Sequence, residues 1–235
     1  MKPIFVLLCG LLSLGVASAS TVTCNAPPNG GVPTNVADNL QISCGGLIFS
    51  NFAAFPAGGN PRPEIDLVSA LYDAASGMVN LSFNPNMSAP PSGGYQDIHF
   101  FFSVQGAIDQ IDLSVGGRNA TIIETACKSP IPMTGQANEG ICAPNQTLAT
   151  LTAFSAPPGP NSDVSAVFSP SLMTYIYKDL GVSPTYPNGA GGGLTTFSQS
   201  FHVAAPVPEP FSLLLTGTGL AGLGLVRRGK KAGRA

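Results

Sequence analysis

Tryptophan is absent from this chain of 235 residues, and charged residues make up only 9% of it. Typical soluble domains carry about 25% charged residues, and long helices or coiled coils are rich in Ala, Glu, Lys and Leu. The shortage of charge therefore disfavours a long-helix protein. Nucleic-acid binding is disfavoured as well, because a formal net charge of −2 supplies no basic patch to neutralise phosphates.

Glycine, proline and apolar residues are abundant instead. The chain contains 28 Gly and 22 Pro, and 44% of its residues are hydrophobic. Disordered chains combine high charge with low hydrophobicity, so ordinary disorder is disfavoured. The length suits one domain of ordinary size, and the composition is typical of a β-rich protein that works outside the cytoplasm.

The N-terminus has the three parts of a secretory signal peptide. Lys2 provides a positive charge, residues 4–16 form a short apolar stretch, and Ala17 and Ala19 occupy the small-residue positions before a cleavage site. We expect cleavage after Ala19, so that residues 1–19 are removed. The alternative is a membrane anchor, but the apolar stretch is short for a membrane span.

Cys9 is lost with the signal peptide, and the exported chain keeps four cysteines. An even number of cysteines in an exported protein predicts disulfides, here two. Three pairings are open, and proximity in the sequence favours Cys24 with Cys44 and Cys127 with Cys142. A zinc site is disfavoured, because no C-x-x-C spacing occurs and the two histidines lie far apart in sequence.

The C-terminus also has three parts, which are a short motif, an apolar stretch over 211–226 and a basic tail over 227–235. As a helix the apolar stretch would be about 24 Å long, which predicts a single transmembrane helix if basic side chains snorkel. Cytoplasmic loops are rich in Lys and Arg, so we expect the tail inside and residues 20–206 outside. The alternative, a buried core helix, is disfavoured by the abrupt basic end. The motif is Val207, Pro208, Glu209 and Pro210, and the cations that stop and orient the helix are Arg227, Arg228, Lys230 and Lys231.

Together these parts resemble the PEP-CTERM sorting signal of exported proteins in Gram-negative bacteria that make exopolysaccharide. The resemblance implies export through a secretion translocon and recognition by an exosortase, an integral-membrane protease-transpeptidase. It also implies removal of the tail at or near residues 208–210, and release or transfer to the cell envelope or extracellular matrix. The protein would therefore be anchored in the inner membrane only transiently. The segments 97–104, 122–127, 177–180 and 197–201 look more loosely like the ectodomains of such proteins.

Residues 20–203 are predicted to form an all-β ectodomain, and residues 204–235 the linker and sorting signal. Short runs rich in β-branched and aromatic residues recur between Gly, Pro and Asn, which favours an antiparallel β-sandwich of jelly-roll type. One run, 65–72, also has helical spacing and is either a strand or a short helix. The other predicted strands are 41–43, 47–52, 78–83, 99–105, 110–115, 120–127, 147–154, 164–168, 172–179 and 195–203, and the predicted loops are 26–33, 56–63, 84–94 and 156–161.

The ectodomain is acidic. Residues 20–206 contain four cations and eleven anions, a formal net charge of −7 that the basic tail hides in the whole chain. The simplest interpretation is the solubility of a secreted domain. Calcium binding, or avoidance of acidic polymers, is the sharper alternative, but no D-x-D-x-D-G loop supports a calcium site.

Patterns of catalytic residues are weak. No G-x-S-x-G elbow occurs, which disfavours a serine hydrolase. Asp97 and His99 would lie on one face of a strand, as an acid–base pair does, although a structural hydrogen bond is the commoner role. Two carboxylate pairs, Asp109 with Asp112 and Glu64 with Asp66, have residue types that glycosidases use. The aromatic run 100–102 would point to alternate faces of a strand and pack in the core.

These observations favour a non-enzymatic exported protein of the cell surface or extracellular matrix, sorted by an exosortase. We expect no cofactor and no metal. The first alternative is a carbohydrate-binding module or a glycosidase that acts on exopolysaccharide. The second alternative is a protein whose tail is not cleaved, so that it stays anchored in the inner membrane.

Overall fold

A computed structural model describes residues 21–25, 34–36, 40–57, 64–91, 93–131, 142–155, 163–184 and 191–205. The predicted signal peptide 1–19, the motif at Val207–Pro210 and the segments 211–226 and 227–235 lie outside the described residues. The chain divides into two units, 1–203 and 204–235, and the fold below is that of the first unit. It is all-β, and the residues that the structure describes contain no helix.

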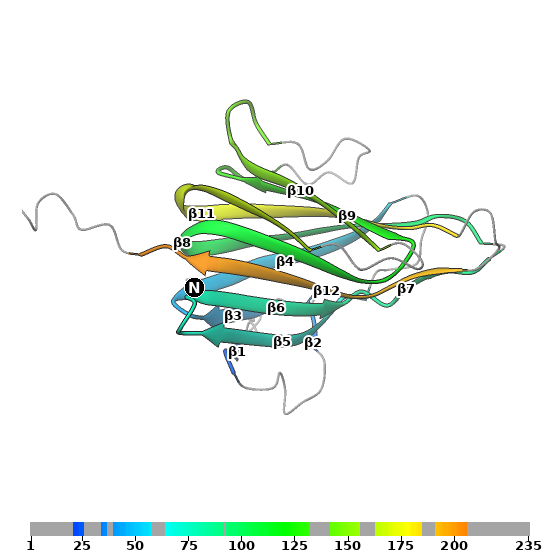
Figure 1. Cartoon of the computed structure of the whole chain (residues 1–235), viewed down its shortest axis with the longest axis horizontal. Helices are drawn as coiled ribbons and strands as arrows, with labels where there is room; N and C mark the ends of the chain where they lie inside the picture. The colour runs from blue at the N-terminus through cyan, green and yellow to red at the C-terminus, as the bar shows by residue number, and fades with distance from the viewer. Residues whose placement is uncertain are drawn as a thin grey trace, which may run out of the picture. The chain divides into compact units, whose positions relative to one another are not determined.

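The described residues of this unit form twelve strands (Figure 1). Their bounds are β1 Thr21–Thr23, β2 Thr34–Asn35, β3 Gln41–Cys44, β4 Leu47–Ala57, β5 Asp66–Asp73, β6 Met78–Asn84, β7 Met87–Ala89, β8 Gln96–Arg118, β9 Ala120–Cys127, β10 Thr147–Ser155, β11 Asp163–Val182 and β12 Gly192–Val203. No helix among the described ranges is long and apolar enough to cross a membrane.

The longest strand, β8, holds the fold together. Its first half pairs with β4 and its second half with β12, while β11 runs along its other side almost throughout. From β11 one layer continues through β9 to β10, and from β4 it continues through β3 to β1. From β12 the second layer continues through β6 and β5 to β2. All of these pairings are antiparallel except the one between β1 and β3.

A bulge lets β8 belong to both layers. The register with β12 shifts between Gln110 and Ile108, so Asp109 is an extra residue on β8. An extra residue reverses which side chains face the core. The residues that face the main core are accordingly even-numbered before the bulge and odd-numbered after it: Ile98, Phe100, Phe102 and Val104, then Ile111, Leu113 and Val115.

The sequence predicts a break between two strands at two places, and the structure has a continuous strand with an irregularity at both. The predicted strands 99–105 and 110–115 are both parts of β8, and 164–168 and 172–179 are both parts of β11. Gly106 supplies a positive φ of 121° on β8, a conformation that favours glycine. Pro170 lies where the register of β11 shifts between Val167 and Ser171, so it occupies an irregular position that needs no ladder hydrogen bond.

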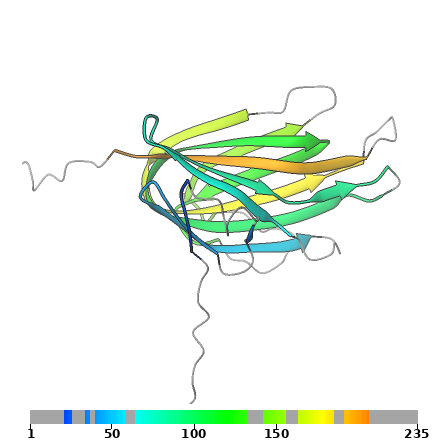
Figure 2. The same cartoon turned by 90° about the horizontal axis from the view of Figure 1, so that it is seen from below.

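The core lies between the two layers and is rich in phenylalanine. Phe49 on β4 and Phe201 on β12 meet across it with ring centroids 5.1 Å apart. In Figure 2, β4 (light blue) and β12 (orange) lie on opposite sides of the fold. Packing of two strand layers over an apolar interior is the arrangement of a β-sandwich, so the predicted all-β, sandwich-like fold is confirmed.

A second, smaller apolar cluster covers the outer face of the first layer. Phe101 on β8 and Tyr177 on β11 point away from the main core and pack with Ile131 and the disulfide between Cys127 and Cys142. Phe100 and Phe102 face the main core, so the alternation predicted for the run 100–102 is confirmed.

Both disulfides join the cysteines that proximity in the sequence favours. Cys24 and Cys44 have Cα atoms 4.8 Å apart, and their bond ties the short strand β1 to β3 at one edge. Cys127 and Cys142 have Cα atoms 5.5 Å apart, and their bond closes the segment that follows β9. Both distances are ordinary for disulfides.

Four details of the prediction need correction or completion. The run 65–72 is the strand β5 and not a helix, because it pairs with β6 and β2. Strands β1, β2 and β7 were not predicted, and β7 interrupts the predicted loop 84–94 by pairing with β12. Runs of two or three residues are too short to show an alternating pattern.

Candidate functional site

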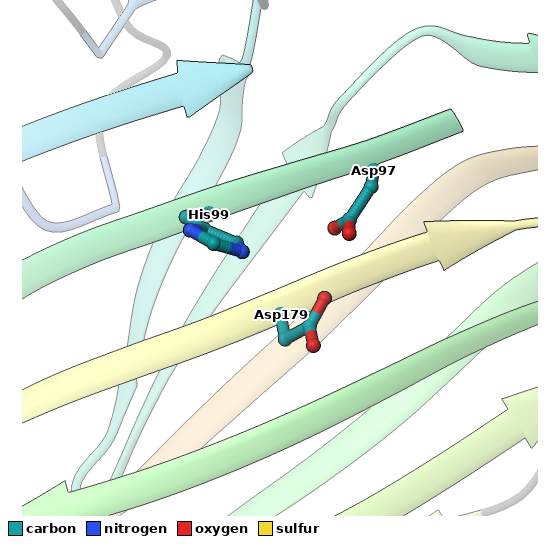
Figure 3. Close-up of side chains that lie close together, drawn as sticks. All are labelled: Asp97, His99 and Asp179. Carbon is teal, nitrogen blue, oxygen red and sulfur yellow. The ribbon is translucent and has the colours of Figure 1, made fainter. Parts of the chain in front are cut away.

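Three polar side chains meet on the outer face of the first layer. Asp97 and His99 come from β8, and Asp179 comes from the neighbouring strand β11, where it is paired in register with His99. Each offers an atom within 4.8 Å of the others, and all three are partly buried. Figure 3 shows the carboxylates of Asp97 and Asp179 directed toward each other between the two strands.

Burial and the nearby acidic groups raise the pKa values of Asp97 and Tyr95. The pKa of Asp97 is raised to about 7, first by burial and then by its hydrogen bond and charge interaction with Asp179. The pKa of Tyr95 is raised to about 12, by burial and by the charges of Asp97 and Asp179. Asp97 is therefore partly protonated near neutral pH, because its carboxylate is buried and lies close to a second acidic group.

The sequence placed Asp97 and His99 on one face of a strand, and the structure confirms that placement. The contribution of Asp179 was not foreseen, since it depends on the register between strands 80 residues apart. His99 also packs edge-on against Tyr177, with centroids 5.5 Å apart, so its ring has a structural contact as well. The three side chains could hold a cation, but their proximity alone assigns none.

The members of the two predicted carboxylate pairs lie in different settings. Asp109, the extra residue of the β8 bulge, lies 2.6 Å from Nδ1 of His202. Asp112 accepts a hydrogen bond of 2.9 Å from Nε2 of Gln110. Glu64 is exposed and precedes β5, which begins at Asp66. The contacts of Asp109 and Asp112 give these two carboxylates structural partners.

A polar depression of about 370 Å³ lies on the outer face of the second layer. Its lining comes from β6, β8, β11 and β12, and hydroxyl groups predominate. Nδ2 of Asn80 donates to Oγ of Ser200 across it at 2.9 Å. The lining residues are Asn80, Asp112, Ser114, Asp163, Val164, Ser165, Ser198 and Ser200.

Two charged residues are buried in the core, although the charges of the ectodomain are interpreted from the sequence as solvent-exposed. Glu124 on β9 and Lys178 on β11 are both 0% exposed, and they form an ion pair. They are register partners, so their proximity follows from the pairing of β9 with β11. The sequence carried a faint signal, because both lie at positions whose neighbours two residues away are apolar.

Asp97 makes stability depend on pH in a direction opposite to that of ordinary acidic groups. Its pKa rises from 3.8 to about 7 on folding, so the folded state binds more protons between these values. The stabilisation is complete below pH 3.8 and is lost as pH rises through about 7. We expect Asp97→Asn to reduce this dependence in urea unfolding measured from pH 4 to 8, and Asp163→Asn to leave it in place. Equal slopes in wild type and Asp97→Asn would contradict the assignment.

Comparison with protein-family models found no match, and comparison with curated proteins found no similar sequence. The resemblance of residues 207–235 to the PEP-CTERM signal therefore stays a prediction from the sequence.

Proposed function

We propose that the chain is an exported, non-catalytic protein of the cell surface or extracellular matrix, sorted by an exosortase. Its route runs through a secretion translocon, with a transient stay in the inner membrane. The proposal includes a jelly-roll type for the sandwich and a transmembrane helix over 211–226. Its site residues are the motif Val207–Pro210 and the four cations that follow the apolar stretch.

The observation that carries the proposal is the formation of two disulfides within a strand-rich domain. Disulfides persist in oxidising compartments and are rare in the cytosol. An oxidising environment agrees with a leader over 1–19 and with residues 20–206 lying outside the cytoplasm. The sorting step rests on the resemblance of residues 207–235.

Replacing Glu209 with alanine tests the sorting step. The change leaves the apolar stretch and the basic tail intact, so insertion should survive while exosortase recognition fails. In a host that makes an exosortase, we expect wild type to lack residues 211–235 and Glu209→Ala to accumulate uncut in the inner membrane. Intact mass and membrane fractionation measure both outcomes, and Glu64→Ala is the matched control.

A second variant separates recognition from orientation. Neutral replacements of the four cations, Arg227, Arg228, Lys230 and Lys231, should weaken the membrane stop while keeping the tripeptide, because each cation resists crossing by about 3 kcal/mol. That protein should be mis-sorted to the outside. A wild-type protein that keeps Ala235 in such a host would show that the tail is a plain anchor, and would overturn the proposal.

Exopolysaccharide binding is the second candidate function, and the polar depression favours it. Its hydroxyl, amide and carboxylate groups can exchange hydrogen bonds with sugar hydroxyls, although no aromatic side chain lines it as a stacking surface. Glycan binding that is lost on Asp112→Ala and Ser200→Ala, in a protein with normal unfolding, would favour this candidate over a purely structural role.

A further inference from the structure

Three polar side chains meet in the main core, and each is 0% exposed. Nζ of Lys178 on β11 donates hydrogen bonds to Oε2 of Glu124 on β9 and to Oε1 of Gln199 on β12. Glu124 and Lys178 are partners within one layer, whereas Gln199 belongs to the facing layer. The amine of Lys178 is thus held between a carboxyl group and a carboxamide.

Burial works against the charged form of each partner in this ion pair. The Lys178 Nζ lies 5.6 Å from the centroid of the Phe197 ring, and Phe100 is the strand partner of Lys178 on β8. Burial lowers the pKa of Lys178 and raises the pKa of Glu124. Moving one proton from the ammonium to the carboxylate leaves a neutral amine and a neutral acid with no net change in protons bound. A neutral buried lysine is a nucleophile, and a neutral buried acid is a proton donor.

Two atoms of this cluster have no hydrogen-bond partner among the described residues. They are Nε2 of Gln199 and Oε1 of Glu124, both buried. A buried polar atom without a partner is costly and calls for an explanation. Loss of the Gln199 nitrogen would remove one of these two costs, and the Glu124 carboxyl contacts Nζ of Lys178 through its other oxygen, Oε2.

We propose that Lys178 and Gln199 become joined by an intramolecular isopeptide bond that the folded domain forms with Glu124 as the proton-transfer group. The lone pair of Nζ attacks Cδ of Gln199, and the carbonyl electrons move onto Oε1 to give a tetrahedral intermediate. Glu124, as the neutral acid, delivers its proton to Nε2 and then takes a proton from Nζ. The bond between Cδ and Nε2 then breaks, the carbonyl re-forms, and ammonia leaves.

The three side chains supply every atom and electron pair that the reaction needs. An amine and a primary amide give a secondary amide and ammonia, with no oxidant or reductant, and the mass of the chain falls by about 17 Da. The reaction depends on the fold, because Lys178 is 54 residues from Glu124 and 21 from Gln199 in the sequence. Because the fold holds the amine and the amide in contact, the reaction is intramolecular and faster than the same reaction between free molecules. The new bond would join the two layers covalently across the core, and the inference does not depend on the proposed sorting.

The test is peptide mass analysis of the folded full-length chain after reduction and denaturation. An endoprotease that cuts before aspartate separates residues 163–178 from the fragment that begins at Asp179. We expect these two fragments to stay linked, with a mass lower by about 17 Da than the sum of the masses of the two separate fragments. Trypsin should also fail to cut after Lys178.

Variants assign the roles. Lys178→Met removes the nucleophile, and Glu124→Gln keeps the size and hydrogen bonding of the side chain while removing proton exchange. Both should give separate fragments, and Glu64→Gln should stay linked. Separate fragments and cleavage after Lys178 in the folded wild type would overturn the proposal and leave a buried ion pair. A loss of about 18 Da, from a link between Lys178 and Glu124, would overturn the assignment of Gln199 as the acceptor.

Discussion

Replacing Glu124 with alanine is expected to lower the free energy of unfolding by about 3–5 kcal/mol. Without Glu124 the proposed link cannot form, so Lys178 keeps a free amine. That amine then lies without its carboxyl partner in a core where water cannot replace it. Breaking one side of a buried ion pair is costly because the remaining group must be neutralised or stay uncompensated. Urea unfolding followed by circular dichroism measures the loss.

Two comparisons make this expectation specific. Glu64→Ala removes an exposed glutamate and should change stability by no more than about 0.5 kcal/mol. Combined replacement of the cluster by apolar residues, Glu124→Leu with Lys178→Met and Gln199→Leu, should recover most of the stability, because no charge is then buried. A loss below about 1 kcal/mol in Glu124→Ala would show that Lys178 reaches water or another partner.

Phe83→Ala is expected to lower the free energy of unfolding by a similar amount, about 3–5 kcal/mol. The Phe83 ring is 0% exposed and lies within 6.5 Å, centroid to centroid, of four other rings. These belong to Phe52, Phe100, Phe102 and Phe197, so the ring lies between strands of both layers. Its removal leaves a cavity that rigid neighbours cannot fill.

Phe154→Ala is the matched control, since Phe154 on β10 is 54% exposed. The same deletion should cost at most about 1 kcal/mol there, because little apolar area returns to water. The denaturation midpoint should shift while its slope stays constant, which indicates a change in stability alone. Equal losses in the two variants would contradict the placement of the core between the layers.

Much of the strand content could be predicted, because alternation and β-branched residues are local signals. Ala120–Cys127 was predicted with the bounds that β9 has, and 78–83 falls one residue short of β6. Gly106 and Pro170 misled the prediction, since both residue types end strands more often than they occupy bulges. A local pattern cannot show that a strand continues beyond an irregularity when its partners are distant.

The composition of the sites could not be predicted in the same way. Asp97 and His99 are two residues apart, so strand geometry alone placed them together. Asp179 joins them only because β11 pairs with β8 in one particular register. The cluster of Glu124, Lys178 and Gln199 depends in addition on the packing of one layer against the other, for which the local sequence contains no signal.

Sharing of β8 between the two layers has a consequence for the cooperativity of unfolding. If the second layer opened alone, the second half of β8 would lose its pairing with β12. The bulge at Asp109 forms against β12, so it would be lost too, and with it the orientation of the first half of β8, which pairs with β4. The layers are therefore not independent foldons, and their amides should exchange with solvent through one global opening. Residual protection confined to one layer is not expected, and the domain should unfold as a single two-state unit.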